Sequence, residues 1–171
     1  MIWLHSTSRK TVAPQAGFTL VEIVVAILLI GILAYTVIPR YQNRSVFDVN
    51  AQAEQLASDI RYTQSLAMTS GQRNRINLAA TSYQITTSAG VPAVHPATGS
   101  SAAISLTNVS LSGYNPPLNN NYIAFDGKGI PYTDVVAATP LGANATITLS
   151  SPGTTPRQIV VSPQTGRVIV Q

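Results

Sequence analysis

Apolar residues form one nearly unbroken run close to the start of the chain, from Phe18 to Ile38. A transmembrane helix needs about 20 such residues, whereas the apolar part of a secretory signal spans only about 7–15 and precedes its cleavage site. The run therefore predicts a transmembrane helix over residues 18–38. Arg9 and Lys10 before it place the N-terminus in the cytoplasm, although Arg40 and Arg44 beyond it oppose that orientation.

One residue of this run is acidic. A carboxylate such as that of Glu22 is costly in lipid, and it usually has either a functional partner or access to the membrane surface. A plain membrane anchor explains the length of the run but gives no reason for Glu22. The residues alone leave two interpretations open, a plain anchor and a helix that assembles with other proteins.

A second helical pattern follows the run. Apolar residues recur every three or four positions and polar residues occupy the opposite side, which predicts an amphipathic helix over residues 39–70. Gly71 is a typical residue just beyond a helix end. We expect the apolar side to pack on a sheet and the polar side to face water. The apolar positions are Val46, Val49, Ala53, Leu56, Ala57, Ile60 and Ala67, and the polar ones are Asp48, Gln52, Gln55, Asp59 and Gln64.

After Gly71 the pattern changes to short runs rich in β-forming residues, separated by Pro, Gly and Asn. Residues 71–171 therefore form a β-rich globular domain, with surface loops expected at 88–101 and 112–121 and a hairpin turn at 162–166. The fold class is α+β, a long N-terminal helix packed on an antiparallel β-sheet domain. The predicted strands are Arg75–Leu78, Tyr83–Thr87, Ala103–Leu106, Tyr122–Phe125, Ala145–Leu149, Gln158–Val161 and Arg167–Val170.

Composition narrows the possible functions. The hydrophobic fraction of 45% argues against a disordered chain, and the charged fraction is only 9%. The absence of cysteine excludes disulfides and thiolate chemistry. Of the net charge of +4, Arg9 and Lys10 account for two, which leaves +2 beyond residue 17 and predicts no nucleic-acid partner.

Motifs for catalysis or cofactor binding are missing. His95 stands beside Pro96 without a nucleophile motif, so we expect a solvated loop histidine. The run 126–129, Asp-Gly-Lys-Gly, lacks the spacing of phosphate and EF-hand loops and predicts a tight turn at the end of a strand. We expect no enzyme activity, cofactor or metal. Arg61, Arg73 and Arg75 are expected to be solvated charges near the helix end.

The start of the apolar run resembles the processing site of type IV pilins and type II secretion pseudopilins. The matching residues are the run from Gly17 to Glu22, GFTLVE, and Pro39. The resemblance implies that prepilin peptidase removes the leader, residues 1–17, by cutting after Gly17, and that Phe18 becomes N-methylated. It also implies that Glu22 pairs with the N-terminal amine of a neighbouring subunit during assembly.

Two residues interrupt the helical run. Gly31 costs about 1 kcal/mol relative to alanine, and Pro39 removes a backbone hydrogen bond. The family resemblance implies a flexible region that changes during filament assembly. A simple kink near the membrane surface is the alternative.

The later part of the chain resembles the GspH/FimT group of minor pilins and pseudopilins, and minor pilins of the mannose-sensitive haemagglutinin pilus look similar. The segments concerned are Leu56–Gln72, Ile123–Gly129 and Gln158–Val168. We therefore expect a minor subunit that is a single-pass protein of the bacterial inner membrane, with its globular domain in the periplasm, and that enters a filament after processing. The implied partners are prepilin peptidase, other pilin or pseudopilin subunits and the inner-membrane assembly platform.

Two other functions stay open. A membrane-tethered periplasmic binding domain would keep residues 1–17 and tolerate the loss of Glu22. A FimT-like DNA-uptake pilin would need a cluster of basic side chains, for which the net charge of +2 gives little support. The sequence does not separate a pilus from a secretion pseudopilus, or a tip position from a shaft position.

Overall fold

The structure is a computed structural model that describes residues 17–42, 44–115, 118, 121–134 and 139–171. The side chains of residues 36–42, 44, 113 and 115 are not among those described. Of the predicted leader, residues 1–17, only Gly17 is among the described residues. The chain divides into two compact units, Met1–Tyr41 and Gln42–Gln171.

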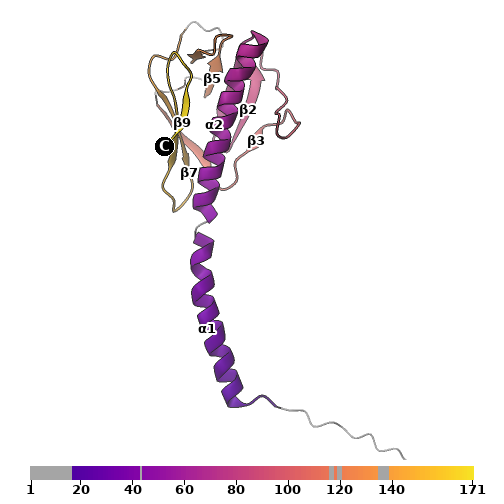
Figure 1. The fold of residues 1–171 in the computed structure, drawn as a ribbon, viewed down its shortest axis with the longest axis vertical. Coiled ribbons are helices and arrows are strands. Elements are labelled where there is room, and N and C mark those ends of the chain that lie inside the picture. Colours follow the sequence, from indigo (N-terminus) through magenta and orange to yellow (C-terminus); the bar gives the residue numbers. More distant parts are fainter. Residues whose placement is uncertain (1–16, 43, 116–117, 119–120, 135–138) are drawn as a thin grey trace, which may run out of the picture. The chain divides into compact units, whose positions relative to one another are not determined.

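The described part of the first unit is helix α1, Leu20–Gln42, drawn in indigo and violet in Figure 1. It begins two residues later than the predicted start at Phe18, and its backbone stays helical through Gly31 and Pro39. In the part of the chain that the structure describes, no helix meets both the length and the hydropathy of a membrane span. The last residues of the predicted span, from Thr36, lie beyond the described side chains.

Helix α2, Arg44–Ser70, opens the second unit. It ends as predicted before Gly71, whose φ of 66° is the left-handed conformation that commonly terminates a helix. Two positions differ from the predicted faces. Val46 was expected to be buried but is exposed, and Asp59 was expected in water but is only 5% exposed. The predicted apolar positions that the structure buries are Val49, Ala53, Leu56, Ala57, Ile60 and Ala67.

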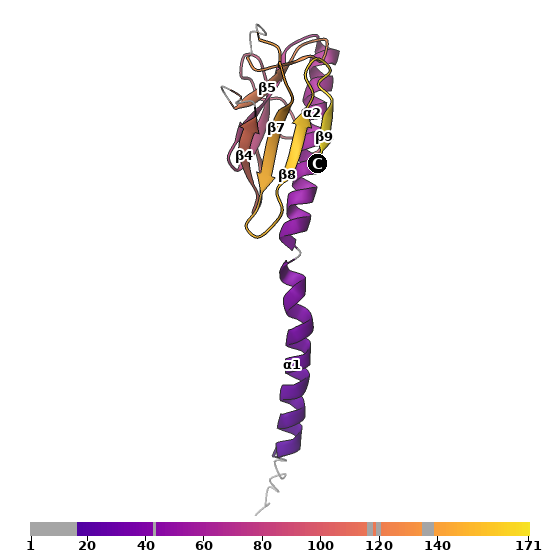
Figure 2. The same ribbon diagram turned by 90° about the vertical axis from the view of Figure 1, so that its left-hand side faces the viewer.

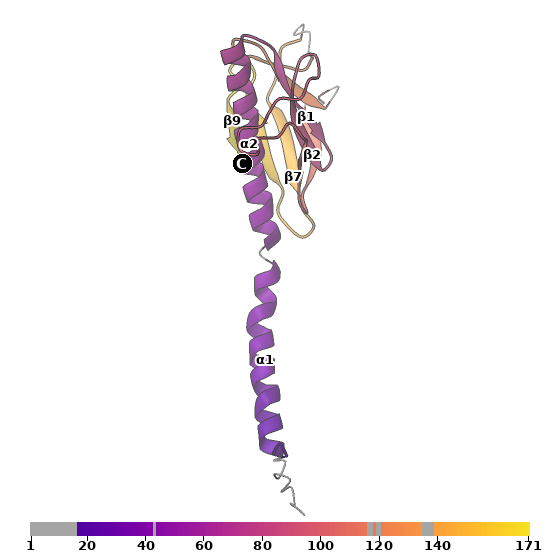
Figure 3. The same cartoon turned by 90° about the vertical axis from the view of Figure 1, so that its right-hand side faces the viewer.

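Nine strands follow α2 in the described residues, and every pairing between them is antiparallel. They form two sheets rather than one, with the strand orders β3-β2-β1-β5-β6 and β4-β7-β8-β9. Figure 2 shows the four-stranded sheet, and Figure 3 shows β1 and β2 of the other. The bounds are β1 Asn74–Ala79, β2 Ser82–Thr87, β3 Ile104–Ser105, β4 Ser110–Asn115, β5 Tyr122–Phe125, β6 Pro131–Tyr132, β7 Ala145–Ser150, β8 Arg157–Val161 and β9 Val168–Val170.

All seven predicted strands are present, with ends that differ by one residue at most. The prediction missed β4 and β6. Residues 112–121 were expected as a loop, but β4 covers Ser110–Asn115 and its register shifts between Ser112 and Tyr114. A β-bulge of this kind breaks the strict alternation by which a strand is recognised in a sequence. Strand β6 has only two residues, which is too short for any pattern.

The core lies between α2 and the two sheets. Helix α2 packs against β1 and β5 of one sheet and against β7, β8 and β9 of the other. Small residues on the buried side of the helix, such as Ala53, Ala57 and Ala67, bring its backbone close to the strands. The strands contribute large side chains, among them Tyr83, Phe125 and Ile147. One apolar core therefore joins α2 to both sheets.

Candidate assembly site

The predicted processing site lies in the non-helical segment just before α1. Residues 17–19 are exposed and have no regular secondary structure, and the helix starts at Leu20. A peptide bond in such a segment is accessible to a peptidase, whereas one inside a helix would first have to unwind. A Cβ atom added at Gly17 would meet no other atom of the described chain within 4 Å. A requirement for glycine at this position would therefore come from the peptidase and not from the fold.

Glu22 occupies a defined place in the first turn of α1. Its backbone N–H donates to the Thr19 Oγ1 at 3.2 Å and to the Thr19 carbonyl at 3.0 Å, so Thr19 caps the helix. Thr19 and Glu22 have the spacing of a capping box, Thr-x-x-Glu. Sequence reasoning missed this role, although the motif was readable. A negative charge in the first turn also interacts favourably with the helix dipole.

The surface around Glu22 is apolar. All described side chains of α1 from Leu20 to Tyr35 are exposed, and the described residues supply the Glu22 carboxylate with no hydrogen bond or ion pair. Contiguous exposed apolar surface of this extent marks a site of contact with protein or membrane. The single acid within it distinguishes α1 from a uniformly apolar helix. A Cβ atom at Gly31 would also meet nothing within 4 Å, so the helix itself does not require glycine there.

A second carboxylate lies inside the globular unit, where Asp59 of α2 binds two side chains. The Tyr83 hydroxyl donates to Asp59 Oδ2 at 2.5 Å, and His95 Nε2 lies 2.7 Å from Asp59 Oδ1. Tyr83 and His95 are 1% and 5% exposed. The prediction of a solvated His95 was therefore wrong, because a buried carboxylate needs partners and a sequence does not show which distant residue supplies them.

The hydrogen bonds of this network define its protonation. The Ala97 N–H donates to His95 Nδ1 at 3.2 Å, so Nδ1 is an acceptor and Nε2 carries the proton donated to Asp59. Burial, followed by the hydrogen bond and the charge of Asp59, raises the pKa of Tyr83 well above its usual range. Every polar atom of the network is satisfied, and a neutral histidine without a neighbouring nucleophile gives it no catalytic role. The network fastens the segment around His95 to α2.

Two turns that contain glycine, at residues 126–129 after β5 and 162–166 between β8 and β9, both contact Gln64 of α2. Its side-chain amide donates to the carbonyls of Gly129 at 2.8 Å and Thr165 at 2.9 Å. Gly129 and Gly166 have φ angles of 81° and 64°, and a Cβ atom at Gly166 would lie 2.8 Å from the Gly129 carbonyl oxygen. This close approach explains why glycine stands in the two segments that resemble the GspH/FimT group.

The segment 126–129 is a turn, as predicted. The Asp126 Oδ1 atom accepts hydrogen bonds from the N–H groups of Lys128 and Ile130, both at 2.9 Å. Its carboxylate is thus used to close the turn that follows β5. Among the described residues, no group of His, Cys, Asp or Glu side chains has an arrangement suited to a metal ion.

Two arginines that were expected to be solvated make specific contacts. Arg61 donates from Nη2 to the Val168 carbonyl at 3.0 Å and so covers part of the edge of β9. Arg75 donates from Nε to Thr86 Oγ1 at 3.1 Å, and its guanidinium lies 5.1 Å from the centre of the Tyr122 ring. Both arginines therefore stabilise the globular unit.

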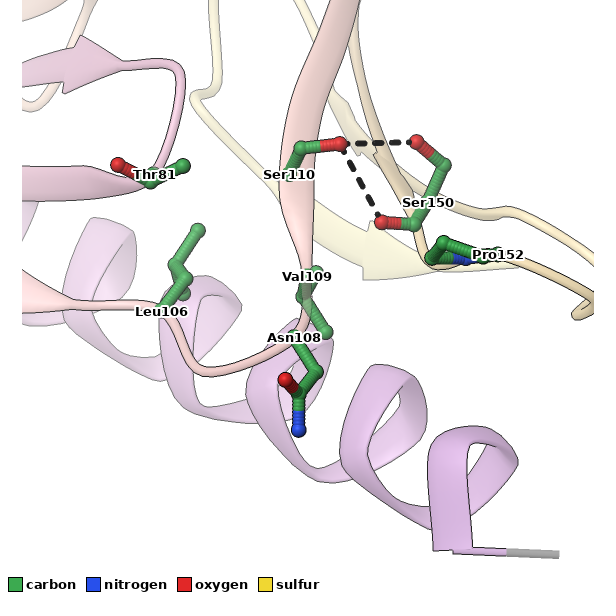
Figure 4. A pocket seen from close by; sticks show the side chains of 7 residues that line it. All are labelled: Thr81, Leu106, Asn108, Val109, Ser110, Ser150 and Pro152. Atoms are coloured by element: carbon green, nitrogen blue, oxygen red, sulfur yellow. Dashed lines mark hydrogen bonds between the residues drawn. The ribbon is translucent and has the colours of Figure 1, made fainter. Parts of the chain in front are cut away.

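A shallow groove of about 330 Å³ lies beside the start of β4. Figure 4 shows the side chains that line it. Ser110 Oγ lies 3.4 Å from the Ser150 carbonyl and 3.3 Å from Ser150 Oγ. The groove has no charged side chain and no base beside its hydroxyl groups, so it offers no nucleophilic chemistry. Its lining consists of Thr81, Leu106, Asn108, Val109, Ser110, Ser150 and Pro152.

Comparison with known proteins identifies the family. The profile described as type II transport protein GspH matches residues 52–165, which is well over half of the chain and includes Gly129 and Thr165, the two turn residues that bind Gln64. The chain belongs to the GspH family. The prokaryotic N-terminal methylation motif matches residues 13–34, which include Gly17, Phe18 and Glu22. No curated protein matches the sequence.

Two solved structures are similar to this GspH-family chain. The type IV minor pilin FimU of Pseudomonas aeruginosa has 18% identity and a TM-score of 0.49, over 71% of this chain and 91% of FimU. The minor pseudopilin EpsH from the type 2 secretion system of Vibrio cholerae has 10% identity and a TM-score of 0.48, over 72% of this chain and 96% of EpsH.

Membership in the GspH family makes the chain a pseudopilin of type II secretion, a structural subunit and not an enzyme. The methylation motif implies a prepilin that is anchored in the inner membrane and processed by prepilin peptidase. The family also implies assembly with other pseudopilins. The family agrees with the expected function, and the packing of α2 on two antiparallel sheets agrees with the expected α+β fold class.

Proposed function

We propose that this GspH-family chain is cut between Gly17 and Phe18, methylated on Phe18 and inserted into a secretion pseudopilus through α1. Residues 18–38 form its membrane segment, residues 39–70 continue as the second helical part, and residues 71–171 lie in the periplasm. The assembly platform of the inner membrane extracts the processed subunit from the bilayer.

The observation that carries this proposal is the exposed apolar surface of α1 with one acid in its first turn. Cutting after Gly17 would create a positively charged amine at Phe18, close in sequence to Glu22. A charge alone in hydrocarbon is costly, and an oppositely charged partner reduces that cost. The Glu22 carboxylate is exposed in the single chain and thus available to the amine of a neighbouring subunit.

The cleavage step is tested by the substitution Gly17→Ala in the full chain. The fold has room for this methyl group, so the globular unit should keep its stability while removal of the leader falls by more than about tenfold. Intact mass of the membrane protein measures the result. Wild-type protein should begin at residue 18 with one added methyl group. A wild-type protein that keeps its first 17 residues would refute the proposal.

A further inference from the structure

The connection between β2 and β3, residues 88–103, is unusually long for a compact domain. Connections of more than about 12–15 residues without secondary structure are uncommon and usually have a function. Apart from the buried His95 and the partly exposed Gly90 and Ala93, every residue of this segment is exposed. The segment therefore adds little to the core of the domain. We call residues 88–103 the contact loop.

The contact loop is held in one conformation although it is exposed. The Ala93 N–H donates to the Ile85 carbonyl and the Thr87 N–H to the Val91 carbonyl, both at 2.9 Å, which fastens the start of the loop to β2. Further along, the His95 N–H donates to the Ser100 carbonyl at 2.8 Å, and the Gly99 N–H donates to the His95 carbonyl at the same distance. These bonds close a small turn around His95.

The side chain of His95 then anchors that turn to α2 through Asp59. Burying a carboxylate has a desolvation cost, and apolar residues of similar size often stabilise a fold equally well. Here Asp59 accepts from Tyr83 of the core and binds His95, whose ring meets Tyr62 edge-on. Apart from His95, the loop places only Ala93, in part, against the core. A loop that is ordered before binding loses less conformational entropy when it binds. The anchor therefore indicates that the loop presents its exposed surface to a binding partner.

The contact loop contains no charged residue, and its exposed part from Val91 to Ala97 is apolar. The Arg75 guanidinium lies beside Gly90 at the start of the loop and is held there by Thr86 and the Tyr122 ring. Val91 and Val94 are each 60% exposed, and Pro92 and Pro96 beside them are exposed as well. No Asp, Glu, Lys or Arg occurs in the sequence from residue 76 to residue 125. Nucleic acids and anionic membrane surfaces are bound mainly through Lys and Arg, so neither fits this surface. An uncharged patch on another protein fits this surface.

The size of the patch limits the partner further. A stable interface between free proteins buries at least about 1,000 Å², far more than two valines and two prolines provide. Such a patch suffices when the partner is already held nearby, because tethering gives an effective concentration in the mM range. In the proposed function, α1 holds each subunit beside its neighbours in the filament.

We propose that the contact loop packs through Val91 and Val94 against an uncharged apolar patch on the globular domain of the adjacent subunit in the pseudopilus. This inference rests on the proposed function. Asp59 and His95 act as positioning residues, because they hold the loop but lie beneath its surface.

The absence of cysteine from the chain allows a direct test. A Val94→Cys variant of the full chain carries one thiol, which takes a photoactivatable benzophenone label. The matched control is Thr155→Cys, at an exposed position between β7 and β8. After illumination of assembled filaments, the label on residue 94 should give about tenfold more adduct with another subunit than the label on residue 155. Equal yields from the two positions would overturn the inference.

Two further variants test the surface of the loop and its anchor separately. Val94→Asp places a charge on the patch and should lower the amount of subunit in the filament by about tenfold, whereas Thr155→Asp should not. His95→Ala releases the loop without changing its surface, so labelled residue 94 should lose its preference over labelled residue 155 even though circular dichroism shows a folded domain. Unchanged crosslinking after His95→Ala would contradict the anchoring role.

The same samples distinguish the two proposals. Leader removal and the amount of wild-type chain in the filament are measured beside the adducts. If wild-type chain is processed and assembled but residue 94 gives no adduct, the inference about the contact loop is refuted and the proposed function stands. Wild-type chain that stays outside the filament refutes the proposed function and the contact loop together.

Discussion

Glu22 and Asp59 are two carboxylates in apolar surroundings, and the two units of the chain treat them in opposite ways. Asp59 is buried among side chains of its own domain and accepts hydrogen bonds from Tyr83 and His95. Glu22 stands on an exposed apolar helix, and only its backbone is hydrogen-bonded by the described residues. The globular unit satisfies its acid by folding, whereas the described residues of α1 leave the Glu22 carboxylate exposed and without a partner.

This difference separates folding from assembly. The unit Gln42–Gln171 has its own apolar core and a satisfied polar network, so we expect it to fold without the rest of α1. The side chains of α1 from Leu20 to Tyr35 are exposed, and in the proposed function their stabilisation comes from lipid or from other helices. Substitutions in the two regions should therefore affect different measurements.

The largest effect is expected at Glu22. Replacement of Glu22 by alanine or glutamine removes the charge that we propose to pair with the amine of a neighbour, and loss of one partner of a buried pair costs about 3–5 kcal/mol. Both variants should enter the membrane normally and be lost from the filament. Glutamine also suits a capping box, so Glu22→Gln separates the charge from the helix cap. Filament assembly by Glu22→Gln at the wild-type level would show that Glu22 acts only as a capping residue.

Asp59 should show the opposite behaviour. Asp59→Ala leaves Tyr83 and His95 without their acceptor inside the domain, and we expect residues 42–171 to lose about 3 kcal/mol of unfolding free energy. Denaturant unfolding measures this loss, with the exposed Glu54→Ala as the control. A loss below about 1 kcal/mol would mean that water reaches the network.

The glycine turns allow a matched test of tertiary packing. Gly166 and Gly153 both have left-handed backbone, but a Cβ atom at Gly166 would meet Gln64, Gly129 and Phe125, whereas one at Gly153 would meet nothing within 4 Å. Gly153→Ala should cost about 1 kcal/mol for the backbone conformation, and Gly166→Ala about 2 kcal/mol more for the clash. Equal losses in denaturant unfolding would show that the turns can move apart.

The smallest effect concerns Tyr83 and alkaline pH. Tyr83→Phe removes one hydrogen bond to a carboxylate and should cost about 1.5 kcal/mol near pH 7. The pKa of Tyr83 is raised in the folded state, so its contribution is complete below about pH 10 and is lost above it, where the unfolded chain releases the proton more easily. The stability difference between wild type and Tyr83→Phe should therefore shrink above pH 10. A stability difference that stays constant up to pH 11 would mean that the Tyr83 hydroxyl is exposed to water.

Much of this protein could be predicted from local patterns. The apolar run, the period of α2, its end at Gly71 and seven strands depend on the order of neighbouring residues, which a sequence displays directly. The motif around Gly17, Phe18 and Glu22 is contiguous, so the sequence displays it just as directly. The Thr19 cap was equally readable and was missed because Glu22 had already been given another role.

The tertiary structure decided the features that join distant residues. The bonds of Asp59 to Tyr83 and His95 bridge 24 and 36 positions, and Gln64 reaches Gly129 and Thr165 across 65 and 101. No local pattern encodes such partners, because they depend on how α2 packs on the two sheets. For the same reason, the sequence predicted a solvated His95, whereas the folded domain buries it to hold the contact loop.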